Sequence, residues 1–142
     1  MGLAFDVREL EAYMAEIFPQ VAEDFAIDAL SVDGITMRLK VAERHLRPGG
    51  TVSGPSMFAL ADVTVYALVL SRLGAKALAV TTNSSLDFMR KPEAGCDIIA
   101  KGQLLKLGRS LAVGDVHMFS QGSDKMVARS TMTYSIPPVR AL

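Results

Sequence analysis

A single acidic residue, Asp62, interrupts the almost entirely apolar run that spans residues 55 to 70 of the 142-residue chain. Burial of an isolated carboxylate is costly unless the group is paired, hydrogen-bonded or protonated. No basic residue lies within one helical turn of Asp62, so any partner must come from elsewhere in the fold. Since a carboxylate in apolar surroundings is suited to general-base chemistry, Asp62 is the strongest catalytic candidate. The alternative is a structural carboxylate that pairs with an arginine or caps another element.

The segment GGTVSGP, residues 49 to 55, precedes this run and supplies the second candidate, Gly54. A helix that begins here presents unpaired N–H groups and the positive end of its dipole. Glycine allows a ligand oxygen to approach closely, and the Gly54 N–H is the best donor because Pro55 has none. Gly54 could therefore stabilise an oxyanion about two helical turns before Asp62. The alternative is an ordinary turn in which Ser53 or Gly54 caps the helix.

Hydrophobic periodicity predicts the elements that must hold these candidates. Apolar residues recur at helical spacing over residues 6–18, whereas residues 35–41 alternate as in a half-buried strand. The pair Asp33-Gly34 between two strand-like runs is typical of a hairpin. The long apolar helix is expected to end at Gly74. Four further strands are expected at about 77–89, 97–107, 111–119 and 126–136.

The predicted order of one helix, two strands, a long helix and four strands indicates the α+β class. One mainly antiparallel sheet that curves around the long helix is the economical arrangement, because a helix that is apolar all round must be covered on most sides. A second copy of the chain could cover what the sheet leaves open. We therefore expect a single domain over residues 1–142, with its core at about 25–136 and an N-terminal helix at about 6–18.

Composition excludes several functional classes. Fifteen basic and fifteen acidic residues give a net charge of zero, which argues against a nucleic-acid partner and makes self-association easier. The one cysteine, Cys96, allows no intramolecular disulfide, which fits a cytoplasmic location. The N-terminus does not read as a secretory signal. The apolar run is shorter than the roughly 20 residues that span a bilayer and contains Asp62, so we expect no membrane partner.

The remaining residues that could carry chemistry form short clusters or stand alone. Arg90-Lys91 and Arg109 lie at the ends of predicted strands, where they either contact phosphates or belong to solvated turns. His45 and His117 are isolated in the sequence. Neither metal-ligand spacing nor a nucleotide-binding motif occurs.

Three segments, SGPSMFALADVTVYALVL, TTNSSLDFMRKP and GRS, together resemble the hotdog-fold acyl-CoA thioesterases of the phenylacetate-pathway (PaaI-like) type. The resemblance covers roughly residues 25 to 136. That family has a His-Gly-Gly turn, a helix with a catalytic Asp or Glu in a context like Leu-Ala-Asp, and a strand that reads approximately Phe-Leu-Arg-Pro. The matching residues of this chain are Leu60 to Asp62 and Phe88 to Pro92.

The resemblance implies a hotdog fold, a curved antiparallel sheet wrapped around one long central helix. It also implies homodimers, often paired into homotetramers, with active sites at the subunit interface and coenzyme A as part of the substrate rather than as a separate cofactor. Asp62 falls on the catalytic carboxylate, and Gly54 falls on the glycine whose N–H polarises the thioester carbonyl. One hydroxyl on the strand after the helix would orient water from the partner subunit. The candidates for this hydroxyl are Thr81, Thr82, Ser84 and Ser85, and the candidates for the coenzyme A phosphates are Arg90, Lys91 and Arg109.

The turn departs from the family pattern, because the family's histidine falls on Ser53 and its second glycine on Pro55. Arg47 lies near the place of the family's upstream asparagine. We expect a homo-oligomeric thioesterase in which Asp62 activates water, or attacks the carbonyl directly, on an acyl-CoA with an aromatic, short or medium acyl group.

Three alternatives belong to other functional classes. Ser53 in place of histidine motivates a protein that binds acyl-CoA or a small ligand without turnover. A hotdog dehydratase or hydratase would pair a histidine with the carboxylate, and no histidine lies near Asp62 in the sequence. A structural interaction module would leave Asp62 in a salt bridge with no pocket beside it.

Overall fold

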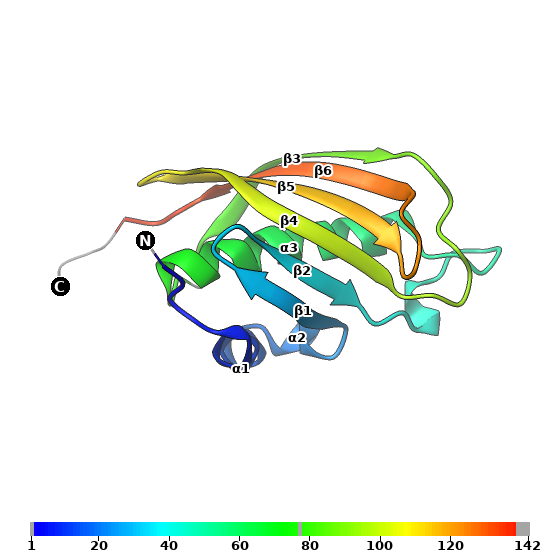
Figure 1. Cartoon of the computed structure of the whole chain (residues 1–142), viewed down its shortest axis with the longest axis horizontal. Helices are drawn as coiled ribbons and strands as arrows, with labels where there is room; N and C mark the ends of the chain where they lie inside the picture. The colour runs from blue at the N-terminus through cyan, green and yellow to red at the C-terminus, as the bar shows by residue number, and fades with distance from the viewer. Residues whose placement is uncertain (1, 77, 139–142) are drawn as a thin grey trace.

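A single antiparallel sheet of six strands curves around one long helix in the computed structural model of the chain (Figure 1). The structure describes residues 2–76 and 78–138, so the first residue of the predicted strand 77–89 and the ends of the predicted domain lie outside the described residues. The strand order in the sheet is β1-β2-β4-β5-β6-β3. The elements are α1 (Val7–Ile17), α2 (Pro19–Ala22), β1 (Phe25–Ser31), β2 (Gly34–Leu39), a 3₁₀ turn (Glu43–His45), α3 (Gly54–Leu73), β3 (Val80–Phe88), β4 (Ile98–Leu107), β5 (Leu111–Ser120) and β6 (Met126–Ser135).

This architecture is the predicted hotdog fold, and the predicted element order is confirmed. Within β2, Ile35, Met37 and Leu39 are buried as the alternation predicts. Two short elements were not predicted: the 3₁₀ turn before α3, and α2, which follows α1 after Phe18. The first residue of α2 is Pro19, a position where the missing N–H costs no helical hydrogen bond.

The central helix α3 accounts for the long apolar run. Ser53 caps its N-terminus, and Gly74 ends it with a φ of +82°, a conformation that favours glycine. The helix is long and apolar enough to cross a membrane, but 67% of its most apolar window is buried inside the fold. Its apolar character therefore follows from its position in the core, where the sheet covers it.

Two glycines in the sheet allow α3 to pack closely against it. A Cβ atom at Gly102 would lie 2.7 Å from the Thr64 side chain, and one at Gly114 would lie 2.9 Å from Val65. Contacts this short do not occur between real side chains, so both positions require glycine for the observed approach of the helix.

The two edge strands are protected to different extents. At the β1 edge, α1 covers the strand, and the Glu11 carboxylate accepts a hydrogen bond of 2.9 Å from the Ile27 N–H. β3 forms the opposite edge, at the top of Figure 1, with no described strand beyond it. Large apolar side chains are exposed there, including Val80 and Phe88, which are 56% and 54% exposed. An unpaired strand edge with exposed apolar side chains is a surface suited to a second chain.

Candidate active site

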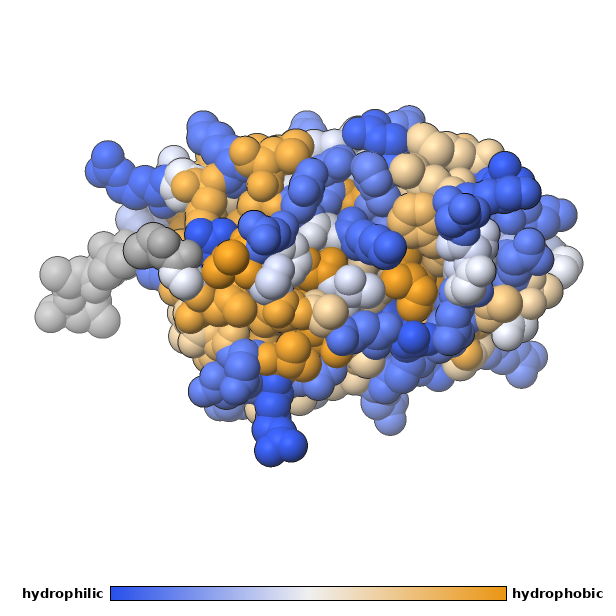
Figure 2. Space-filling view, in the orientation of Figure 1, coloured by the Kyte–Doolittle hydropathy of each residue, from blue (hydrophilic) through white to orange (hydrophobic). Residues whose placement is uncertain are grey.

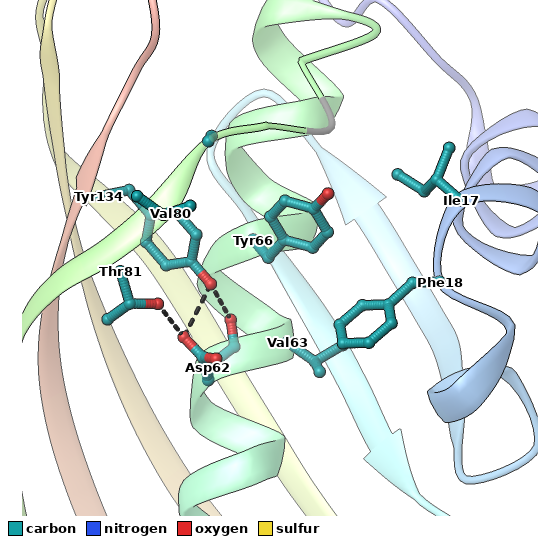
Figure 3. Close-up of a pocket in the computed structure, with 9 residues that line it drawn as sticks. Ile17, Phe18, Asp62, Val63, Tyr66, Val80, Thr81 and Tyr134 are labelled. Carbon is teal, nitrogen blue, oxygen red and sulfur yellow. Dashed lines mark hydrogen bonds between the residues drawn. The ribbon is translucent and has the colours of Figure 1, made fainter.

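The Asp62 carboxylate lies on α3 where the helix passes the beginning of β3 (Figure 3). Its Oδ1 atom accepts hydrogen bonds from Thr81 Oγ1 at 2.5 Å and from the Tyr134 hydroxyl at 2.7 Å. The Tyr134 hydroxyl is also 3.0 Å from the backbone oxygen of Asp62. Among the described residues, none donates a hydrogen bond to Oδ2. The two hydroxyls therefore orient the carboxylate and leave one of its oxygens available.

Tyr134 is the residue of this site that the sequence did not reveal. In the sequence, Tyr134 shares one face of the last predicted strand with Met132 and Ile136, but nothing in the spacing linked it to Asp62. Burial, and secondarily the nearby Asp62 charge, raises the pKa of Tyr134 well above its usual range. Tyr134 therefore stays protonated at physiological pH and can act as a permanent hydrogen-bond donor to the carboxylate.

An apolar hollow of about 330 Å³ opens beside this carboxylate. Phe18 and Tyr66 line it, with their ring centroids 6.2 Å apart in an edge-to-face arrangement, and Val63 also lines it. Figure 3 shows the Asp62 carboxylate, with its two hydroxyl donors, on one side of the hollow and Phe18 on the other. A site of this shape can hold an apolar group next to a base.

Gly54 lines a separate hollow, of about 470 Å³, near the N-terminus of α3. As the first residue of the helix, Gly54 has no intrahelical acceptor for its N–H, and no other described residue accepts from it. Arg47, Arg90 and Lys91 line the same hollow, so a backbone donor and three cationic side chains converge there. This arrangement is suited to an oxyanion and to phosphate groups.

Ser53, the position of the family's turn histidine, acts as the N-cap of α3. Its Oγ accepts a hydrogen bond of 3.3 Å from the Ser56 N–H and lies 3.0 Å from the Ser56 hydroxyl. The capping interpretation of this turn is therefore the one that the structure supports for Ser53.

A backbone hydrogen bond to His45 holds the turn before α3. The His45 carbonyl accepts a hydrogen bond of 2.8 Å from the Ser53 N–H. Its ring is buried, and Nε2 lies 3.4 Å from the carboxylate of Asp24, which also pairs with Arg44. Burial acts to raise the pKa of Asp24, but Arg44 and His45 outweigh this effect and hold that pKa below its usual range.

Of the four hydroxyl candidates on β3, the structure brings only Thr81 to Asp62. The Thr82 hydroxyl is 3.4 Å from the Thr133 carbonyl, and Ser84 and Ser85 are exposed along the edge strand. The resemblance implied that one of these hydroxyls acts from a partner subunit, and this stays a prediction. Within one chain, Thr81 bonds the Asp62 carboxylate because the beginning of β3 lies directly beside α3.

Within one chain, the base and the oxyanion donor are not together. Gly54 and Asp62 are separated by about 12 Å of helix rise and line different hollows.

The basic residues that were candidates for the coenzyme A phosphates lie at two opposite ends of the sheet. Arg90 and Lys91 follow the end of β3, whereas Arg109 lies in the β4–β5 turn at the opposite end of the sheet (Figure 1). A single copy therefore cannot bring Arg90 and Arg109 to one nucleotide, since a strand of ten residues spans about 30 Å.

Two of the alternative interpretations of Asp62 do not match its surroundings. In the part of the chain that the structure describes, no cationic side chain forms an ion pair with Asp62. The structural carboxylate paired with arginine is therefore not observed. Neither His45 nor His117 lines the hollow beside Asp62, so the histidine that a dehydratase requires is not present there.

Ionic side chains occupy the outer face of the sheet, away from both hollows. Arg38 pairs with Asp28 and Asp97 at 2.9 and 3.0 Å, and Arg129 pairs with Asp87 and Asp115. Hydrophilic side chains are accordingly spread among apolar ones on the face of the molecule seen in Figure 2. Across residues 2–76 and 78–138, no group of three or more His, Cys, Asp or Glu side chains is placed to hold a metal ion.

Comparison with known proteins gives consistent matches over most of the chain. The model of the Thioesterase superfamily matches residues 49–127. Mouse acyl-coenzyme A thioesterase 13 is 25% identical over 131 residues, which cover 90% of this chain and 92% of that protein. A protein from Silicibacter sp. TM1040, provisionally named a thioesterase, is 69% identical, with a TM-score of 0.91 over 96% of this chain and 94% of that one. The N33D mutant of the phenylacetic acid degradation protein PaaI from Thermus thermophilus is 26% identical, with a TM-score of 0.72 over 84% of this chain and 99% of that one.

Proposed function

Since the chain belongs to the thioesterase superfamily and is a thioester hydrolase, we propose that it hydrolyses acyl-CoA with Asp62 as the base. One observation carries the proposal: two hydroxyl donors hold Asp62 Oδ1, while none of the described residues donates to Oδ2, and the carboxylate lines an apolar hollow. A half-buried carboxylate oxygen that no described residue bonds can accept a proton during the reaction.

Coenzyme A is the proposed carrier because of the charges around Gly54. Arg47, Arg90 and Lys91 line that hollow, and guanidinium and ammonium groups bind phosphates through charge-assisted hydrogen bonds. The match to mouse acyl-coenzyme A thioesterase 13 supports the same carrier.

The separation of Gly54 from Asp62 leads us to propose that two copies form each site. A full antiparallel overlap of two nine-residue β3 strands would place Ser84 at the twofold axis and Val80 opposite Phe88 of the second copy. Gly54 packs against its own Phe88, since a Cβ at Gly54 would lie 3.2 Å from that ring. Pairing would therefore bring the Gly54 hollow of one copy next to Asp62 of the other. It would also cover the exposed apolar side chains of β3.

The proposed reaction uses the free oxygen of Asp62. A water attacks the carbonyl carbon of the thioester while one of its protons moves to Oδ2. The oxyanion that forms accepts a hydrogen bond from the Gly54 N–H of the second copy. The C–S bond then breaks, the thiolate takes the proton from Asp62, and the acid and coenzyme A leave. In the variant of this mechanism, Oδ2 attacks the carbonyl carbon itself and the C–S bond breaks, so that coenzyme A leaves as the thiolate. Water then hydrolyses the anhydride to the acid and the Asp62 carboxylate, and the proton released goes to the thiolate.

The first test is release of free thiol from a panel of acetyl-, hexanoyl-, decanoyl-, palmitoyl- and phenylacetyl-CoA. Tight binding without thiol release from any member would refute the proposal and support a binding protein.

A complementation experiment tests the shared site. Asp62→Asn removes the base. Gly54→Pro removes the donor N–H at a first-turn position where the helix backbone accepts proline, with a small shift of the exposed Phe88 ring, which a Cβ at this position would approach to 3.2 Å. Each variant alone should be inactive. After subunit exchange, the mixture should recover about a quarter of the wild-type activity, because random pairing gives heterodimers with one intact site. A mixture that stays inactive, although exchange is shown by mass spectrometry, would refute a site shared between copies.

A further inference from the structure

A second apolar hollow, of about 280 Å³, lies next to the one that contains Asp62. Val63 lines both hollows, and α1 passes along both. Met14 and Ala15 of α1 line the second hollow, and Ile17, at the end of the same helix, lines the first. The two hollows are therefore neighbours beneath one helix, and the Val63 side chain lies between them.

We propose that the second hollow binds the distal carbons of a straight-chain acyl group whose thioester lies at Asp62. The inference rests on the proposed thioesterase function, and it makes Val63 and the α1–α2 segment the determinants of acyl-chain length. The acyl chain would begin beside Asp62, pass Val63, and end between α1 and the β1–β2 hairpin.

The lining of the second hollow fits an alkyl chain. Its inner wall is formed by Ile27 and Met37, both buried core residues. The carboxylate of Glu11, which also lines it, is already bonded to the Ile27 N–H. Lys40 is exposed at the rim. An apolar wall with its polar groups bonded or solvated favours methylene groups over a polar ligand.

Substitutions that change the second hollow alone can test this assignment. Ala22→Leu adds a large side chain from α2 to the lining of the second hollow. We expect kcat/KM for decanoyl- and palmitoyl-CoA to fall by about tenfold or more, since each buried methylene contributes about fourfold. The value for acetyl-CoA should be nearly unchanged. The matched control, Ala12→Leu, adds the same side chain at an exposed position of α1 that lines neither hollow, and should leave the chain-length profile unchanged.

Val63→Ala is the complementary variant, because it removes two methyl groups from the residue that lines both hollows. We expect the ratio of kcat/KM for palmitoyl-CoA to that for acetyl-CoA to rise by about fourfold or more. Val65→Ala is its control: it removes the same carbons from a buried position of α3 that packs against Gly114 and lines neither hollow. If Ala22→Leu does not fold, the Val63→Ala and Val65→Ala pair still decides the question.

The outcomes separate this inference from the proposed function. If the wild type hydrolyses acyl-CoA but neither Ala22→Leu nor Val63→Ala changes the chain-length profile, the second hollow does not bind the acyl chain. If the wild type hydrolyses no acyl-CoA, the proposed function fails. Binding of a decanoyl thioether of coenzyme A to the wild type and to Ala22→Leu, measured by calorimetry, then tests the hollow directly. Equal affinities would overturn the inference, and weaker binding to Ala22→Leu would support it.

Discussion

Replacement of Asp62 by asparagine separates a catalytic carboxylate from a structural one. The asparagine Oδ1 can still accept the hydrogen bonds that Thr81 and Tyr134 donate to Asp62 at 2.5 and 2.7 Å. The amide nitrogen takes the place of the free Oδ2, which removes the basic oxygen and keeps the shape. We therefore expect kcat to fall by about 10²-fold or more, the scale of a lost general base, which corresponds to at least about 2.7 kcal/mol of activation free energy. KM should change little.

The stability of Asp62→Asn follows from the same contacts. A neutral acceptor weakens each of the two hydrogen bonds by about 1 kcal/mol, while the removal of a half-buried charge acts in the opposite direction. We expect the free energy of unfolding to change by less than about 2 kcal/mol. The melting temperature and kcat should be measured on the same sample.

Asp97→Asn is the control, because it should affect stability without affecting catalysis. Asp97 accepts hydrogen bonds from Arg38 at 3.0 Å and from the Val41 N–H at 2.9 Å, far from the Asp62 hollow. This variant should lower the melting temperature and leave kcat near the wild-type value. If instead Asp62→Asn is stable and turns over thioesters at a near-normal rate, Asp62 is not the base.

Three further predictions concern the neighbours of the site and the stability of the fold. Tyr134→Phe removes one donor to the Asp62 carboxylate but keeps the ring packing; kcat should fall about tenfold with little change in KM, and a proportional rise in KM would contradict a positioning role. Arg90→Ala and Arg109→Ala should each raise KM for acyl-CoA but not for a truncated thioester without the nucleotide, and equal effects on both substrates would show a structural role. The lowered pKa of Asp24 stabilises the fold above the unfolded value of 3.8, and this stabilisation is lost as the pH falls through the lower native value. Asp24→Asn should therefore make stability less dependent on pH in acid, as measured by urea unfolding.

The sequence predicted the elements well because each has a strong local signal. Pro55 and Gly74 mark the two ends of the apolar helix, and the observed helix runs from Gly54 to Leu73. Residues 35 to 39 alternate strictly, and the observed strand buries every second one. Signals of this kind depend on a few neighbouring residues, so they are readable without the tertiary fold.

The site was predictable only where its residues carry such a local signal. Asp62 stands out because it is a charge in an apolar run, whereas Tyr134 lies 72 residues later and reads as one more inward-facing residue of a strand. Thr81 could not be chosen over its neighbours because the irregularity in β3 between Thr81 and Asn83 changes which side chains face the helix. Long-range register therefore decided the partners of the carboxylate.

The structure explains how the turn before α3 can depart from the family pattern and still present the proposed oxyanion donor. Ser53 takes the position of the family's histidine, and its side chain caps α3 while its N–H donates to the His45 carbonyl at 2.8 Å. These contacts fix the backbone immediately before Gly54. Because the proposed oxyanion donor is the Gly54 N–H, its direction depends on that backbone rather than on a side chain at position 53. The replacement of histidine by serine therefore leaves the donor in place, which is why we propose an active thioesterase rather than a protein that only binds its ligand.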